Sequence, residues 1–198
     1  MKPKSLYRAA LLECLSYVCL SDSAEARAAY RTYRQLAKKG CPDGWFGLGN
    51  ARQYGEGVKQ NLTKAEKYYR RAAKLGHAKA QESLGRLYDE GLGLPRNYTK
   101  AYKWYARAAL QADETACNNI GFLYYKGNGV RRSKKQAKKW YKLAARAGCI
   151  MALSNLGILY EDTGRLKKAV RYYRRAAEAG SKYAAKQLKR LDKKKSAQ

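Results

Sequence analysis

The sequence is poor in the residue types that most catalytic and metal sites need. It has one histidine, His77, and its five cysteines include no CxxC pair. A single histidine at a junction between helices argues against Ser-His or Cys-His catalysis and leaves no His/Cys cluster for zinc. Acidic residues are scarce too, and the adjacent Glu161 and Asp162 fall at a turn without an apolar cleft that could tune an acid–base pair. We therefore expect no catalytic residue, no metal and no cofactor.

Long apolar runs are absent as well. No stretch approaches the ~20 apolar residues of a membrane-spanning helix, so we expect no transmembrane segment. The odd cysteine count favours reduced thiols and a cytoplasmic protein. A second interpretation stays open, because basic residues precede an apolar stretch over residues 9–20 and Ala24-Glu25-Ala26 resembles a cleavage site. These features together would mark a signal peptide and a secreted or periplasmic protein, although Glu13 interrupts the apolar stretch.

Negative charge is in short supply. The chain has 43 lysines and arginines against 15 aspartates and glutamates, a formal net charge of +28. Such a field favours nucleic acid, anionic membranes or acidic proteins as partners, with strong salt dependence. The excess is uneven, since residues 131–146 contain eight basic side chains and no acidic one, whereas residues 113–129 carry two acidic and one basic.

A 36-residue repeat is the strongest feature that the sequence does contain. A Leu-Gly or Ile-Gly pair recurs four times, and each is followed by a pair of aromatic residues. Self-similarity at this period is typical of stacked helical hairpins, in which each hairpin buries its apolar face against its neighbours. The pairs are Leu48-Gly49, Leu84-Gly85, Ile120-Gly121 and Leu156-Gly157, followed by Tyr68-Tyr69, Trp104-Tyr105, Trp140-Tyr141 and, four residues early, Tyr172-Tyr173.

Each repeat is expected to contain a helix A, a glycine loop and a helix B. Residues 79–90 place their apolar side chains at helical spacing, and Gly91 and Gly93 then end the helix, because glycine tolerates the left-handed backbone of helix ends. The periodic recurrence of these glycine pairs predicts turns, not phosphate-binding loops. Helix B is expected to begin at an N-cap, and the residues at that position are Asn61, Asn97 and Ser133.

The repeat pattern reads A-x3-L-G-x2-Y-x2-G-x-G-V, then K-A-x2-W-Y-x2-A-A-x2-G. It resembles the Sel-1-like repeat, a relative of the tetratricopeptide repeat. The resemblance covers residues 41–180 and, more faintly, residues 5–40, where Tyr33 and Gly40 precede Tyr69 and Gly76 by 36 residues. In the last repeat the loop at residues 161–165 is four residues shorter and looks more like a tetratricopeptide turn.

The resemblance implies an all-α, right-handed superhelical solenoid of about five helical hairpins with a capping helix at its C-terminal end. The expected segments are a degenerate N-terminal repeat or cap over residues 1–40, four repeats over residues 41–76, 77–112, 113–148 and 149–180, a capping helix over residues 181–192 and a flexible basic tail over residues 193–198.

In related superhelices helix A lines the concave groove and helix B the convex face. The resemblance therefore implies a near-neutral groove and a basic outer face. The residues expected in the groove are Phe46, Asn50, Glu82, Arg86, Asn118, Phe122, Tyr125, Ser154 and Ile158. The densest part of the basic face is expected at Arg131, Arg132, Lys134, Lys135, Lys138, Lys139 and Lys142.

By resemblance, the function expected is that of a non-catalytic adaptor or scaffold that binds a protein or peptide in its groove, with acidic partners favoured by the net charge. The alternative is that the basic face binds RNA, DNA or an anionic membrane. No nucleic-acid-binding module is recognisable, and Trp140 and Tyr141 occupy core positions of the repeat, which makes them poor candidates for stacking on bases. Protein binding is therefore our first hypothesis and polyanion binding our second.

Overall fold

The computed structural model describes residues 23–196, and Cys14, Cys19 and the apolar stretch over residues 9–20 lie outside them. The described residues form helices joined by short loops, without a strand among them, as the all-α prediction requires. Between residues 23 and 196 no helix is both long and apolar enough to cross a bilayer. Ser23 accepts a hydrogen bond from the Ala26 amide at 3.1 Å, so Ala24-Glu25-Ala26 forms the first turn of a helix.

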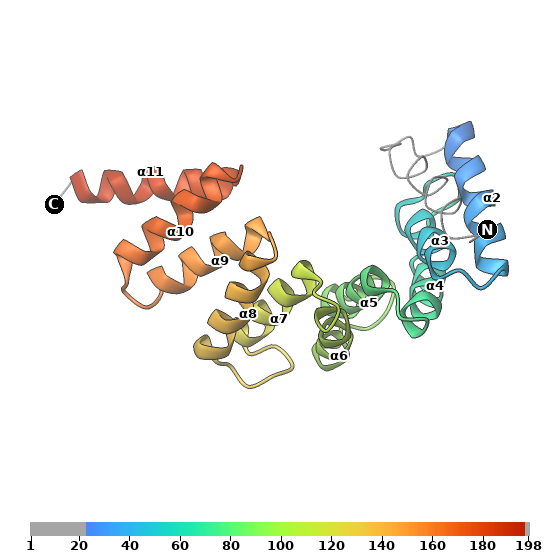
Figure 1. The fold of residues 1–198 in the computed structure, drawn as a ribbon, viewed down its shortest axis with the longest axis horizontal. Coiled ribbons are helices and arrows are strands. Elements are labelled where there is room, and N and C mark those ends of the chain that lie inside the picture. Colours follow the sequence, from blue (N-terminus) through green and yellow to red (C-terminus); the bar gives the residue numbers. More distant parts are fainter. Residues whose placement is uncertain (1–22, 197–198) are drawn as a thin grey trace, which may run out of the picture. The chain divides into compact units, whose positions relative to one another are not determined.

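The chain divides into two compact units, each described here by itself. Of the described residues, the first unit contains 23–87 and 91–95, and the second contains 88–90 and 96–196. Figure 1 shows the helices in chain order, coloured from blue to red. Their bounds are α2 (Ala24–Lys38), α3 (Pro42–Tyr54), α4 (Leu62–Lys74), α5 (Ala78–Glu90), α6 (Tyr98–Ala109), α7 (Glu114–Lys126), α8 (Lys134–Arg146), α9 (Ile150–Glu161), α10 (Leu166–Glu178) and α11 (Lys182–Ser196).

Within each unit, helices that follow one another in sequence pack together. In the first unit α3 packs on α2 and α4. In the second unit every helix from α6 to α11 packs on the next, and α11 also contacts α9. The A helices of the repeats are α3, α5, α7 and α9, and the B helices that follow them are α4, α6, α8 and α10.

The recurring Leu-Gly pair and the second aromatic of helix B are two halves of one contact. The rings of Tyr69, Tyr141 and Tyr173 are buried and lie directly against the glycines of their own hairpins. A Cβ at Gly121 would come within 2.6 Å of the Tyr141 ring, and one at Gly157 within 2.4 Å of the Tyr173 ring. Glycine is therefore required there because the aromatic ring occupies the space of a side chain.

The glycine loops are turns, as predicted. Gly55 and Gly127 end α3 and α7 in the left-handed conformation, with φ of 80° and 83°. The second glycine of each loop lies against an earlier helix, since a Cβ at Gly57 would fall 2.3 Å from the backbone of Ala26, and one at Gly129 would fall 2.7 Å from the backbone of Tyr98. Each loop therefore docks on the start of an earlier helix within its own unit.

The three predicted N-caps are confirmed. The side chains of Asn61, Asn97 and Ser133 accept hydrogen bonds from backbone amides three residues ahead, at 2.8, 2.9 and 3.2 Å. His77, which the sequence suggested to be only a junction residue, is also a cap, because its Nδ1 accepts from the Ala80 amide at 3.0 Å. Asp113 does the same for α7, with the Ala116 amide at 2.8 Å.

The C-terminal boundary differs from the prediction. The capping helix α11 runs to Ser196, past the expected end at residue 192, so residues 193–196 are helical where a flexible tail was expected. Lysine has a high helix propensity, and no glycine or proline follows Gly180 to stop the helix. Residues 197–198 of the expected tail lie outside the described residues.

Candidate binding cleft in the second unit

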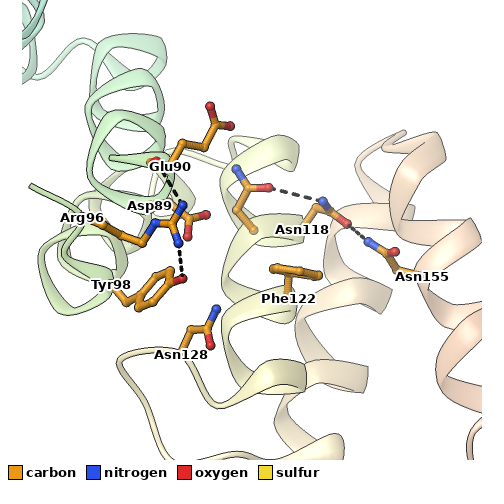
Figure 2. Close-up of a pocket in the computed structure, with 9 residues that line it drawn as sticks. Asp89, Glu90, Arg96, Tyr98, Asn118, Phe122, Asn128 and Asn155 are labelled. Atoms are coloured by element: carbon orange, nitrogen blue, oxygen red, sulfur yellow. Dashed lines mark hydrogen bonds between the residues drawn. The ribbon is translucent and has the colours of Figure 1, made fainter. Parts of the chain in front are cut away.

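The A helices of the second unit border a cleft of about 480 Å³. Its walls come from the end of α5, the start of α6, the A helices α7 and α9, and the loop after α7. Figure 2 shows the acidic and aromatic residues of α5 and α6 on one side and the residues of α7 and α9 on the other. The lining residues are Asp89, Glu90, Arg96, Tyr98, Asn118, Asn119, Phe122, Asn128 and Asn155.

Three of the four asparagines form a hydrogen-bonded row across α7 and α9. The Asn155 side-chain amide donates to Asn118 Oδ1 at 2.8 Å, and the Asn118 amide donates to Asn119 Oδ1 at 3.4 Å (Figure 2). Asn118 is 5% exposed and is held in place, whereas Asn119 and Asn155 are half-buried. Because an amide group has two donors and two acceptor lone pairs, Asn119 and Asn155 keep hydrogen-bonding capacity for a bound molecule.

Phe122 gives the cleft its apolar surface. Its side chain is 39% exposed, which is high for a phenylalanine in the middle of a helix. The Lys126 Nζ lies 5.7 Å from the ring centroid, within the range of a cation–π contact. On the opposite side, Arg96 donates to the Glu90 carbonyl at 3.3 Å and to the Tyr98 hydroxyl at 3.4 Å.

Asp89 carries the strongest electrostatic signal of the cleft. Burial raises the pKa of its carboxyl above the ordinary value, and the neighbouring charge of Glu90 acts in the same direction. The Tyr105 hydroxyl, which donates to Asp89 Oδ2 at 3.3 Å, and the positive charge of Arg96 oppose that rise in pKa. The Asp89 carboxylate is therefore only partly stabilised by the groups around it.

Some of the groove residues predicted for this unit line the cleft, and others make contacts elsewhere. Asn118 and Phe122 line the cleft, and the other three do not. The Tyr125 hydroxyl donates to Asp162, and burial followed by that bond raises the pKa of Tyr125 to about 12. Ser154 is buried with its Oγ 3.1 Å from Ser181 Oγ, and Ile158 packs against the core.

The predicted groove residues of the first unit make contacts inside that unit. Phe46 stacks on the His77 ring with centroids 4.5 Å apart, and Asn50 Oδ1 accepts from the Tyr69 hydroxyl at 2.7 Å. Glu82 is buried, and the Arg86 guanidinium donates to the Tyr54 hydroxyl at 3.1 Å. Their polar groups therefore support the fold of the unit.

Some side chains of the predicted basic face are exposed, and others contact neighbouring groups of the protein. Lys135, Lys139 and Lys142 are exposed, and their spacing places them on one side of α8. Arg132 instead donates to the Tyr125 carbonyl at 3.1 Å, and Lys134 Nζ lies 3.8 Å from Asp162 Oδ2. Lys138 is half-buried and Arg131 is exposed.

Seven of the lining residues are not among those predicted from the sequence. Asn119 and Asn155 stand 36 residues apart, so an amide recurring at one position of helix A was a usable signal. The sequence holds no such signal for the other five, because they come together only through the packing of the loops. These residues are Asp89, Glu90, Arg96, Tyr98 and Asn128. Over the part of the chain that the structure describes, no three of the His, Cys, Asp and Glu side chains come together as a metal site.

Comparisons with known proteins identify the repeats. The Sel1 repeat model matches residues 46–77, 78–113 and 115–149, and a tetratricopeptide repeat model matches residues 149–180. The matched windows begin one to five residues later than the first three repeats expected from the sequence, and the last window has the expected bounds. No curated protein matches the chain.

Solved structures agree with the family models. A Sel1 repeat protein from Oxalobacter formigenes is 33% identical with a TM-score of 0.71, over 83% of this chain and 70% of that one. A protective antigen of uropathogenic Escherichia coli with an SLR fold is 34% identical with a TM-score of 0.75, over 80% of this chain and only 35% of the antigen. An immunity protein from Pseudomonas aeruginosa, 21% identical with a TM-score of 0.65 over 93% of this chain and 69% of its own, shares the fold. The chain belongs to the Sel1 repeat family, a tetratricopeptide-like group of helical repeats whose members are generally non-catalytic interaction modules.

Proposed function

We propose that the protein is a non-catalytic adaptor that binds an extended segment of a partner protein in the cleft of the second unit. The observation that carries the proposal is the asparagine row beside the exposed ring of Phe122. Side-chain amides match the N–H and C=O groups of a peptide backbone, and an exposed phenyl ring offers a contact for one apolar side chain. An extended segment presents both kinds of group at regular intervals.

Preorganisation supports this function. Asn118 is fixed by its bond to Asn155, so the amide row does not have to be ordered when a partner binds. Ordering a mobile side chain costs about 0.5–1.5 kcal/mol on association, and a held side chain avoids that cost. Membership of a family of interaction modules supports protein binding as well.

The test removes one amide and the phenyl ring together. We expect Asn119→Ala with Phe122→Ala to lose the proteins captured from a nuclease-treated lysate, while the far-ultraviolet circular dichroism of the fold is kept. The matched control is Leu110→Ala with Gln111→Ala, which removes an exposed apolar side chain and an amide outside the cleft. Quantitative mass spectrometry that finds the same proteins on the double cleft variant would refute cleft binding.

A second candidate function rests on the exposed stripe of α8. Lys135, Lys139, Lys142 and Arg146 are all exposed and recur at helical spacing, and α8 contains no acidic residue. Such a stripe suits a polyanion, and with several phosphate contacts the affinity should fall by on the order of tenfold or more between dilute and physiological salt. Replacing the four residues by Gln should abolish binding to a single-stranded oligonucleotide, and unchanged affinity would exclude this face.

A further inference from the structure

One feature of the cleft is unexplained by peptide-backbone binding. Two of its nine lining residues are carboxylates, Asp89 and Glu90, in a chain whose formal net charge is +28. Figure 2 shows them on one side of the cleft, facing the asparagine row and Phe122 on the other. Glu90 is exposed and Asp89 is half-buried, so the pair spans the edge of the cleft from solvent to interior.

The same pair recurs two repeats later in a different environment. Glu161 and Asp162 stand 72 residues after Asp89 and Glu90, at the same position of helix A. There Arg190 forms an ion pair with Glu161, and Lys134 lies 3.8 Å from Asp162. The chain thus supplies a cationic side chain to each carboxylate of the later pair.

The pair in the cleft has no such ion pair among the described residues. Arg96 is the nearby cation, but its guanidinium donates to the Glu90 backbone carbonyl and the Tyr98 hydroxyl and lies 5.9 Å from the centre of the Tyr98 ring. Within residues 23–196, the one hydrogen bond that the Asp89 carboxylate accepts comes from the Tyr105 hydroxyl. Burial penalises its charge, and a cation placed beside it would offset that penalty.

We propose that the cleft selects a partner segment in which a lysine or arginine stands close to an apolar residue, with the cationic side chain bound by Asp89 and Glu90 and the apolar one on Phe122. The inference rests on the proposed function, since it names the partner chemistry of the same cleft. Solvent ions screen distant charges of the protein over about 8 Å at physiological ionic strength, so the charges in the lining count most at contact, and there two carboxylates outnumber the single guanidinium of Arg96. An acidic segment would meet repulsion at this edge.

The experiment uses a library of random decapeptides on neutral polyethylene glycol beads. Wild-type protein should enrich peptides with a lysine or arginine within a few residues of an aromatic or aliphatic residue. Asp89→Asn with Glu90→Gln keeps the shape of both side chains and should lose the basic preference while the apolar preference remains. A basic peptide from the selection, resynthesised and measured in solution, should bind Asp89→Asn with Glu90→Gln on the order of tenfold more weakly than it binds the wild type. Glu161→Gln with Asp162→Asn, the matched pair, should select the same peptides as the wild type.

The outcomes separate this inference from the function on which it rests. Enriched peptides that lack basic residues, or a basic preference that survives in Asp89→Asn with Glu90→Gln, would overturn the inference. Binding of those peptides that is lost in Asn119→Ala with Phe122→Ala would still uphold the cleft as a peptide site. If the wild type enriches only the peptides that Asn119→Ala with Phe122→Ala also enriches, both the inference and the proposed function are wrong.

Discussion

The A helices of the two units carry different side chains at the same repeat positions. Gly47 in the first unit corresponds to Asn119 and Asn155 in the second. A Cβ at Gly47 would lie 2.5 Å from the Tyr33 ring, so a neighbouring helix of the same unit fills that position, whereas Asn119 and Asn155 line a cleft. The repeat determines where a side chain points, and the residues around it decide whether that place is filled or open.

A second position shows the same contrast. Asn50 and Phe122 stand 72 residues apart at one place on helix A. The Tyr69 hydroxyl lies 2.7 Å from both Asn50 Oδ1 and Gln53 Oε1, so the polar groups of the first unit hold its own core, and burial raises the pKa of Tyr69. Phe122 remains 39% exposed. At this position the first unit uses a polar side chain to hold its own core, and the α7 hairpin of the second unit leaves the Phe122 ring exposed.

The largest loss of stability is expected when Gly47 of the first unit is replaced by asparagine, the residue at the same repeat position in the second unit. Gly47→Asn would drive a side chain into the Tyr33 ring and should lower the free energy of unfolding by about 2–3 kcal/mol, as overpacking does. Urea denaturation followed by circular dichroism measures the loss. The reverse change, Asn119→Gly, removes atoms and causes no overpacking. It should lower the free energy of unfolding by only about 1 kcal/mol, the penalty of glycine in a helix. Equal losses for the two variants would mean that Tyr33 does not close this position.

A smaller effect is expected after α6, the one B helix of the described residues that is followed by a left-handed alanine where α4, α8 and α10 have Gly76, Gly148 and Gly180. Gly76 in the first unit has φ of 88° and open space around it, while Ala112, at the same position in the second unit, has φ of 59°. A left-handed backbone costs a residue with a Cβ about 1 kcal/mol. Gly76→Ala should therefore lower the free energy of unfolding by about 1 kcal/mol and Ala112→Gly should raise it by about as much. A loss of stability in Ala112→Gly would contradict this explanation.

The fold could be predicted from the sequence because the residues that determine it recur at the same position in several repeats. The Leu-Gly pair, the glycine loops and the caps at Asn61, Asn97 and Ser133 each recur at fixed spacing, and local backbone chemistry fixes their roles. Seven of the nine residues of the candidate site were not predicted, chiefly because the site depends on which side chains of neighbouring elements meet. Ser154 holds the same position as Asn118, yet it is buried against Ser181 of the following helix, which no period in the sequence reveals.

The smallest change in stability is expected from protonation of His77 in the first unit. Neutral His77 caps α5 through Nδ1, and protonation would turn that acceptor into a donor and break the cap. Burial lowers the pKa of His77 below its ordinary value, although Asp43 Oδ1, 3.2 Å from Nε2, partly opposes this. The unfolded chain therefore takes up the proton first, and stability that is complete above a pH of about 6.5 declines as the pH falls through the folded-state pKa.

His77→Asn isolates this contribution, because asparagine also caps helices but does not titrate. Between pH 7.5 and 5.5, urea denaturation should show a larger loss of stability in the wild type than in His77→Asn. Every other titrating group is common to both proteins, so the difference between the two losses belongs to the ring at position 77. Equal losses would mean that Asp43 offsets burial in full, and a wild type that gains stability on acidification would show that the ion pair outweighs the cap.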